Sequence, residues 1–119
     1  MADSICWLPE PEDHNYPAAL SYLQLLFSSP RATEIVEKLK GAEVAMFKAK
    51  DIFRASGLSL LGISNFHVEK DRRKIVSGKK LSPLLLVRGE GRLIVADGYH
   101  RMCAVYSVDE DAMIPCKIV

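Results

Sequence analysis

The sequence predicts an α+β fold in which a small mixed sheet has helices packed around it. Two apolar runs, residues 84–87 and 93–96, have the length of buried strands, and glycine or proline lies on both sides of each. Before these runs, hydrophobic residues recur at helical spacing in segments that end at glycine. The 119 residues are 49% hydrophobic and 26% charged, which suits one small globular domain with its own core.

Residues 1–42 form the first predicted unit, an N-terminal extension of two helices. The first helix is expected over residues 16–27, with Asn15 as its cap and Pro17 in its first turn. The second is expected to begin at Ser29-Pro30 and to end at Gly41. Both segments carry an apolar stripe. The sequence leaves open whether this extension covers a core, caps a site or forms a homodimer.

Residues 43–119 form the second predicted unit, in which strands and helices are mixed. Its expected elements, in order, are a strand over 44–50, a short helix from Lys50 closed by Ser56-Gly57, a charged helix over about 67–76 capped by Ser64 or Asn65 and ended by Gly78, a hairpin of strands 84–87 and 92–96, a helix over 98–108 and a strand over 113–119. The apolar segment 58–63 has no clear pattern. Pro115 favours an edge position for the last strand.

The cysteines and the N-terminal residues predict a cytoplasmic location. Cys6, Cys103 and Cys116 are an odd number at wide spacings, which matches neither a zinc signature nor a disulfide framework. Residues 1–12 contain acids and prolines, unlike a signal peptide. No segment approaches the ~18 apolar residues of a membrane span. We therefore expect no membrane partner.

Positive charge is concentrated in the second unit, although the whole chain has a net charge of only +1. Residues 70–92 contain eight Lys or Arg residues and two acidic ones. Such a segment suits a nucleotide phosphate chain or a nucleic acid that is bound weakly and without sequence preference. A solvated helix face followed by a loop gives the same pattern, so charge alone does not decide.

The most informative motif is Asp97-Gly98-Tyr99-His100-Arg101, where an apolar strand passes into a helix. A strand that ends at glycine and continues as a helix exposes backbone N–H groups at the helix start, and the helix dipole adds partial positive charge there. Arg101 and His100 add further donors. The motif therefore predicts a site for an anion, most simply a phosphate group.

In this context the chain from about residue 43 to its last residue resembles the ParB/sulfiredoxin superfamily. The features are a strand and short helix over 44–55, a basic helix ending at Gly78, a proline-led strand over 81–87, the Asp-Gly-x-His-Arg motif followed by an apolar helix, and the closing strand 114–119. The resemblance covers about two-thirds of the chain and leaves residues 1–42 unexplained. It implies a nucleotide ligand, ATP or CTP, with Mg²⁺ as a further cofactor.

The branches of this superfamily match the chain to different degrees. Sulfiredoxins are similar in Gly-x-His-Arg and in the Ile-Pro-x-Lys ending, but Tyr99 stands where their catalytic cysteine lies, which argues against sulfinic-acid reduction. ParB proteins bind CTP phosphates with a Gly-Glu-Arg-Arg box and add a helix-turn-helix domain, neither of which is present in these 119 residues. Free-serine kinases of the superfamily are closer at Asp-Gly-x-His-Arg, but they are longer.

Each motif residue has a functional and a structural interpretation. Gly98, His100 and Arg101 are expected to contact the ligand phosphate, and His100 could also move a proton. Asp97 could act as a base, hold Mg²⁺, orient Arg101 or cap the helix, and Tyr99 could stack on a base or pack on the core. Asp97 and His100 are the candidate catalytic residues. Outside the motif, the candidates for the phosphate tail are Lys74, Lys79 and Lys80.

The sequence thus predicts a nucleotide- or phosphate-binding ParB-like protein, with a phosphotransferase or nucleoside triphosphatase as the enzymatic form. The alternative is a non-catalytic module of ParB type that binds nucleic acid or senses nucleotides, and a nuclease ranks third. The expected partners are a nucleotide or a phosphorylated small molecule. No residue is expected to form a metal site of its own: His14 and His67 lack partners at metal-ligand spacing and are predicted to be surface or capping residues.

Overall fold

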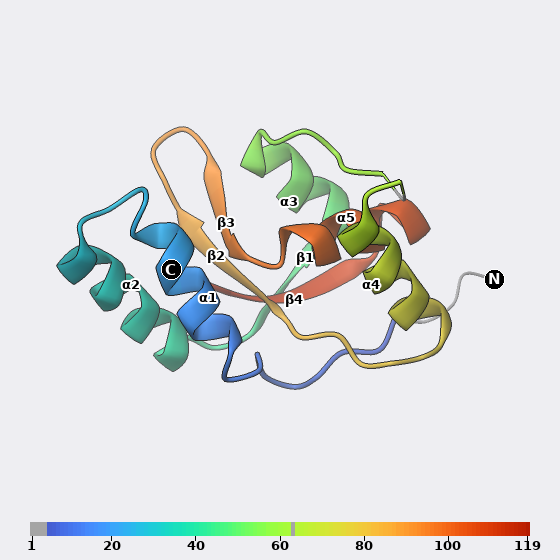
Figure 1. Ribbon diagram of the computed structural model, residues 1–119, viewed down its shortest axis with the longest axis horizontal. Coiled ribbons are helices and arrows are strands. Elements are labelled where there is room, and N and C mark those ends of the chain that lie inside the picture. Colours follow the sequence, from blue (N-terminus) through green and yellow to red (C-terminus); the bar gives the residue numbers. More distant parts are fainter. Residues whose placement is uncertain (1–4, 63) are drawn as a thin grey trace.

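A four-stranded mixed sheet forms the centre of the computed structural model, which describes residues 5–62 and 64–119. The elements in chain order are α1 (Asn15–Leu23), α2 (Ser29–Gly41), β1 (Ala45–Lys48), α3 (Ala49–Ser56), α4 (Phe66–Val76), β2 (Leu84–Arg88), β3 (Leu93–Asp97), α5 (Tyr99–Val108) and β4 (Met113–Ile118). The strand order is β1-β4-β2-β3 (Figure 1). The predicted α+β class is confirmed.

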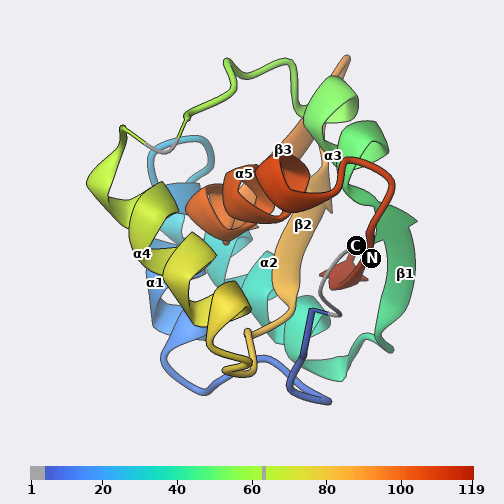
Figure 2. The same cartoon turned by 90° about the vertical axis from the view of Figure 1, so that its right-hand side faces the viewer.

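Helices cover both faces of the sheet, because both strands of the β2–β3 hairpin are apolar on both sides. Leu84 and Leu86 of β2 belong to a core with residues of α3, α4 and α5. Leu85 and Val87 point the other way, into a second core made with α1 and α2. Figure 2 shows α5 in front of the sheet and α2 behind it. The helices α1 and α2 therefore share a core with the sheet, and a domain boundary at residue 42 stays a prediction.

The first helix differs from its predicted form at both ends. It ends at Leu23 instead of 27, and residues 24–26 continue as a tighter turn in which Leu26 N–H donates to the Leu23 carbonyl. Asn15 does not cap the helix. Its Oδ1 accepts from Glu12 N–H and from the Ser82 hydroxyl. This buried side chain therefore ties the start of α1 to the residues that precede β2.

Other boundaries lie close to the predicted ones. Ser28 caps α2, Gly57 closes α3 with φ +65°, and Asn65 caps α4 by accepting from the His67 and Val68 N–H groups. Residues 58–62 lack regular structure, and residue 63 of that predicted apolar segment lies outside the described residues. None of the described helices is both long and apolar enough to cross a bilayer.

The predicted edge position of Pro115 is wrong, because β4 lies inside the sheet. It pairs antiparallel with β1 and parallel with β2. Pro115 is nevertheless in the half of β4 that pairs with β1 only, since pairing with β2 begins at Cys116. The proline therefore lies where the strand is flanked on one side.

Candidate functional site

The turn between β3 and α5 holds the centre of the candidate site. Pairing between β2 and β3 shifts at this point, so that Ala96 forms a bulge before Asp97. Gly98 follows with φ +105°, a conformation that L side chains rarely adopt. A Cβ atom at Gly98 would lie 2.8 Å from Leu84 Cγ and 2.9 Å from Arg101 Nη2. Glycine is therefore required here both for the backbone and for space.

Arg101 is held at this turn by a carboxylate at the end of β3 and by a backbone carbonyl just before β2. Its Nη2 lies 3.1 Å from Asp97 Oδ2 and 3.4 Å from the Pro83 carbonyl oxygen. The two ion-paired side chains are only 17% and 18% exposed. Arg101 Nε is buried and has no hydrogen-bond partner among the described residues. The guanidinium is thus fixed in position while one of its donors is still unsatisfied.

A small hollow lies in front of this turn, between α4 and the first turn of α5. Its volume is about 160 Å³, and its lining residues are His67, Lys70, Asp71, Lys74, Asp97, Gly98, Tyr99, His100 and Arg101. Among the described residues, no group accepts from the N–H groups of Tyr99, His100 or Arg101. No acidic side chain occupies the first turn of α5. The hollow therefore combines free helix N–H donors with basic side chains.

Two histidines from different helices meet at the rim of the hollow. The ring centroids of His67 in α4 and His100 in α5 lie 5.0 Å apart. Burial lowers the pKa of His100 below its ordinary value of 6.5, and His67 lowers it further, whereas Asp71 opposes the shift. His100 is consequently neutral at pH 7. A neutral imidazole at this position can donate one hydrogen bond or accept a proton.

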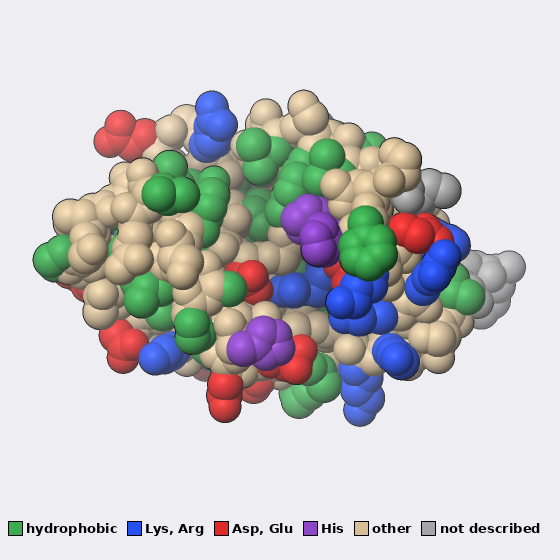
Figure 3. All heavy atoms as spheres, in the orientation of Figure 1, with side chains coloured by type: hydrophobic (Ala, Val, Ile, Leu, Met, Phe, Trp, Pro, Cys, Tyr) green, Lys and Arg blue, Asp and Glu red, His purple; other side chains and the backbone are tan. Residues whose placement is uncertain are grey.

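The basic side chains of α4 fall into two groups. Arg72 and Arg73 both bind Glu69 on the same helix, and Arg72 contributes most to lowering the pKa of that carboxyl to about 2. Lys70 makes no ion pair with any described residue, and Lys74 Nζ lies 3.7 Å from Asp71 Oδ1. The cations that line the hollow are thus the less neutralised ones. Figure 3 shows Lys, Arg and His side chains gathered on this face, over α4 and the start of α5.

A second, wider groove continues along α4 from the hollow. It has a volume of about 530 Å³ and shares Lys70 and Lys74 with the hollow. Phe66, which is 74% exposed, lies on this groove with Arg73, Ser77 and Lys79. An exposed aromatic ring beside cations offers a surface on which a base can stack.

Most of the predicted site residues meet at this place. The five motif residues and Lys74 line the hollow. Lys79 lies on the adjoining groove instead. Lys80 is exposed and lines neither cavity. Whether these residues bind a ligand stays a prediction.

Tyr99 and Cys103 face the core from one side of α5. Burial raises the pKa of Tyr99 to about 12, with a further contribution from Cys103. The Cys103 side chain is fully buried, and burial raises its pKa too. A thiol in this state stays protonated at neutral pH, which makes it a poor nucleophile.

Sequence reasoning missed three residues of the hollow: His67, Lys70 and Asp71. His67 is exposed, as predicted, and its ring centroid also lies 5.0 Å from that of His100. The signal that could have found the three residues is their spacing, because positions 67, 70, 71 and 74 lie on one face of a helix. That face borders the start of α5 across the hollow, an arrangement that the sequence alone does not specify.

No group of three or more His, Cys, Asp or Glu side chains that could hold a metal ion occurs within residues 5–62 and 64–119.

No protein-family model, curated protein or solved structure gives a significant match to the chain. The resemblance to the ParB/sulfiredoxin superfamily therefore stays a hypothesis that depends on the motifs alone.

Proposed function

We propose that this protein binds a phosphorylated ligand, most simply a nucleotide, with a phosphate group in the hollow at the start of α5. The observation that carries the proposal is convergence: unpaired N–H groups of α5, the half-buried Arg101 guanidinium, Lys70, Lys74 and His100 all border one small cavity. Donors from a helix N-terminus and from arginine are the groups that proteins use for phosphate.

The size of the hollow supports a single phosphoryl group there. At about 160 Å³ it is smaller than the cavities of about 300–1,000 Å³ that enclose whole small molecules. The remainder of a nucleotide would extend into the groove along α4, where Phe66 offers a ring for the base and Lys79 a further cation. ATP and CTP, each with Mg²⁺ carried on its phosphates, are the nucleotides that the family resemblance suggests.

In an enzymatic form, the side chains would divide the work of phosphoryl transfer. Asp97 holds Arg101 by its ion pair, so it is better suited to position that guanidinium than to act as a base. Neutral His100 is the group able to accept a proton from an attacking hydroxyl or water. A phosphotransferase or nucleoside triphosphatase of ParB-like type is the enzyme that fits these roles.

The test is calorimetric titration of the protein with ATP, CTP and inorganic phosphate, with and without Mg²⁺. Lys70→Ala is expected to weaken binding, because the lysine borders both cavities and makes no ion pair with a described residue. Lys80→Ala is the matched control, since it removes the same charge from an exposed lysine outside both cavities. Equal affinities for these two variants, or no binding by the wild type, would reject the proposal.

A second candidate is a non-catalytic module that binds nucleic acid or senses nucleotides. The observation that favours it is the continuous basic surface of Lys70, Lys74 and Lys79 beside the exposed Phe66 ring, which also suits single-stranded nucleic acid. In that case oligonucleotide binding should fall steeply with salt, because each phosphate contact releases counterions. Turnover of ATP or CTP that disappears in His100→Gln would favour the enzyme instead.

We also propose that the protein is located in the cytoplasm and forms a homodimer.

A further inference from the structure

A further groove, separate from the hollow and from the groove along α4, lies along β3 on the side of the hairpin away from β4. Its volume is about 630 Å³, and side chains from both helical layers line it. Tyr22 and Leu26 come from the α1 side, and Leu58 comes from the segment after α3. In Figure 1, β3 lies between α1 on one side and α3 on the other. The groove therefore has two apolar walls with a strand between them.

That strand is the edge of the sheet, and its outer backbone groups are unpaired. Gly89 N–H donates to the Arg92 carbonyl at 3.1 Å, which fixes the alternation of the antiparallel ladder. Ile94 then faces β2 with its N–H and C=O groups, and Leu93 and Val95 direct theirs outward. No other described segment donates to or accepts from these outward groups. Buried backbone groups are rarely left unpaired, so this edge lacks a partner.

The part of the edge that lines the groove lacks the charges and prolines that proteins use to prevent pairing. Residues 93–96 contain no charged residue and no proline, although such residues commonly protect a free strand. The strand is instead recessed: Val95 is 7% exposed, whereas Tyr22 and Leu26 on the rim are 41% and 49% exposed. A single extended chain can enter such a groove. The equally recessed edge of a second copy cannot reach it.

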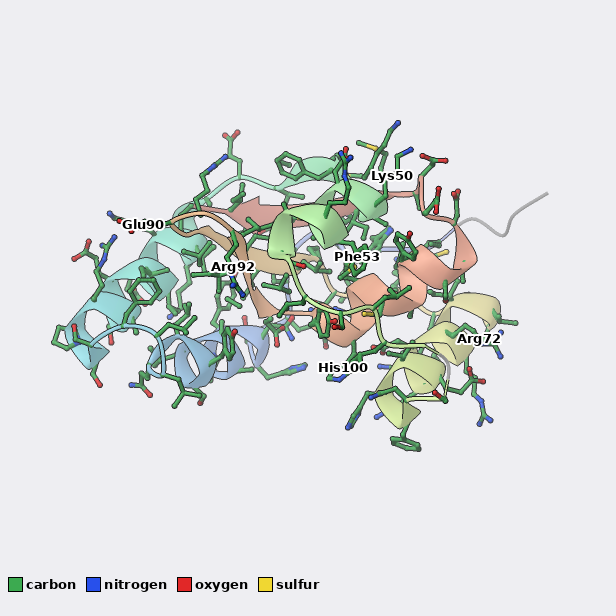
Figure 4. The ribbon with its side chains drawn as sticks, turned by 90° about the horizontal axis from the view of Figure 1, so that it is seen from above. Lys50, Phe53, Arg72, Glu90, Arg92 and His100 are labelled. Atoms are coloured by element: carbon green, nitrogen blue, oxygen red, sulfur yellow. The ribbon has the colours of Figure 1, made fainter. Side chains whose placement is uncertain are left out.

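The charges at the hairpin end of the groove favour an acidic occupant. Arg88 and Arg92 line it and make no ion pair with a described residue, and Glu90 is the only acidic residue in its lining among those described. Figure 4 shows Arg92 near the base of the hairpin loop and Glu90 at its tip, away from His100. The groove is therefore at the opposite end of β3 from the phosphate hollow, and its chemistry does not depend on the proposed phosphate site.

We propose that this groove binds an extended, acidic peptide segment of a protein partner, which adds to β3 as a fifth strand. Hydrogen bonds to the outward groups of Leu93 and Val95 supply the pairing, and apolar side chains at alternate positions fill the two walls. An aspartate or glutamate of the segment lies near Arg88 and Arg92.

The experiment begins with a display library of random 12-residue peptides, selected on the full chain and counter-selected on Leu93→Pro. The proline removes the outward N–H of the first residue of the strand, a position that tolerates proline. Leu93→Ala is the matched control, because it loses the same side chain and keeps the N–H. The most enriched peptide is then labelled, and its affinity is measured by fluorescence anisotropy.

We expect enriched peptides in which apolar residues alternate and Asp or Glu recur. Their binding should be at least tenfold weaker to Leu93→Pro than to Leu93→Ala, and at least tenfold weaker to Arg92→Glu than to wild type. No enrichment over the counter-selection, or equal binding to the two Leu93 variants, would overturn the proposal. So would a dimer in sedimentation velocity that Leu93→Pro converts to monomer, since a second copy would then occupy the groove.

A second measurement keeps the test valid if Leu93→Pro fails to fold. Amide hydrogen exchange is compared for wild-type protein with and without the selected peptide. Exchange should slow at Leu93 and Val95, whose N–H groups face the groove, and change little at Ile94, which is already paired with β2. Slowing at α4 or α5 without any change at β3 would place the peptide elsewhere and refute the assignment.

Discussion

Replacing Gly98 with alanine should damage the fold and the candidate site together. The added methyl group would meet Leu84 Cγ at 2.8 Å and Arg101 Nη2 at 2.9 Å. Leu84 is fully buried, so its branching carbon has no free space to enter. Arg101 can move only by leaving Asp97 and the Pro83 carbonyl. The substitution therefore forces a change in the group proposed to hold the phosphate.

The magnitude has two components. An L residue in a left-handed conformation such as that at Gly98 costs about 1–2 kcal/mol. Overpacking a well-filled site typically adds about 1–3 kcal/mol. The expected loss in the free energy of unfolding is therefore about 2–5 kcal/mol, a large share of the roughly 5–15 kcal/mol of an ordinary domain.

Gly91→Ala separates these two components. Gly91 also has positive φ, +77°, but a Cβ there would have no heavy atom within 4 Å. The Gly91→Ala substitution should lower the free energy of unfolding by the backbone component only, about 1–2 kcal/mol. It should leave phosphate binding unchanged. Urea unfolding of both variants with linear extrapolation gives the comparison. If Gly98→Ala is no less stable than Gly91→Ala, the close packing at the turn does not constrain this residue, and the reasoning fails.

Three further predictions concern the same helix and its neighbours. Asp97→Asn should lower the free energy of unfolding by about 1–3 kcal/mol, because it weakens a charged hydrogen bond. It should also lower the affinity for ATP or phosphate, because Arg101 is no longer held. Calorimetry that finds unchanged affinity would exclude this positioning role. Because burial lowers the pKa of His100 below 6.5, the unfolded chain takes up that proton first as the pH falls, so the free energy of unfolding should decrease from pH 6.5 down to the folded-state pKa. His100→Gln should flatten that part of the stability profile, and an NMR titration of His100 at or above 6.5 would contradict it. Cys103 and Cys116 should resist iodoacetamide in the native protein at pH 7.5 and react after unfolding. The reason is that burial raises the pKa of both thiols, that of Cys116 to about 12. Rapid labelling of the native protein, detected by mass spectrometry, would show that the thiols are accessible.

Local signals in the sequence predicted much of this fold. Ser29-Pro30 and Gly41 bracket α2 because capping and proline geometry are set within a few residues. The turn at Gly98 was predicted for the same reason, since a strand that ends at glycine before an apolar helix is a local pattern. The five motif residues line one hollow because they are adjacent in the chain, and their binding of a ligand stays a prediction.

Features that depend on contacts between distant segments could not be predicted in this way. The inner position of β4 follows from pairing with β1 and β2, which no local pattern encodes. The contact of the exposed His67 ring with His100 could not be predicted, because His100 lies on another helix. Asn15 has a good capping residue type, yet its side chain is used by Glu12 and Ser82. In each case a long-range contact overrides the local preference.

The inner position of β4 has a consequence for synthesis on the ribosome. This strand follows every other element in the sequence, yet it alone joins β1 to β2. While residues 113–118 are still inside the exit tunnel, the nascent chain cannot form a continuous sheet. Contacts between residues so far apart in the chain are slow to form. We therefore expect a released chain truncated before Met113 to leave β1 and one edge of β2 without a strand partner, and the sheet to close as a late, single event.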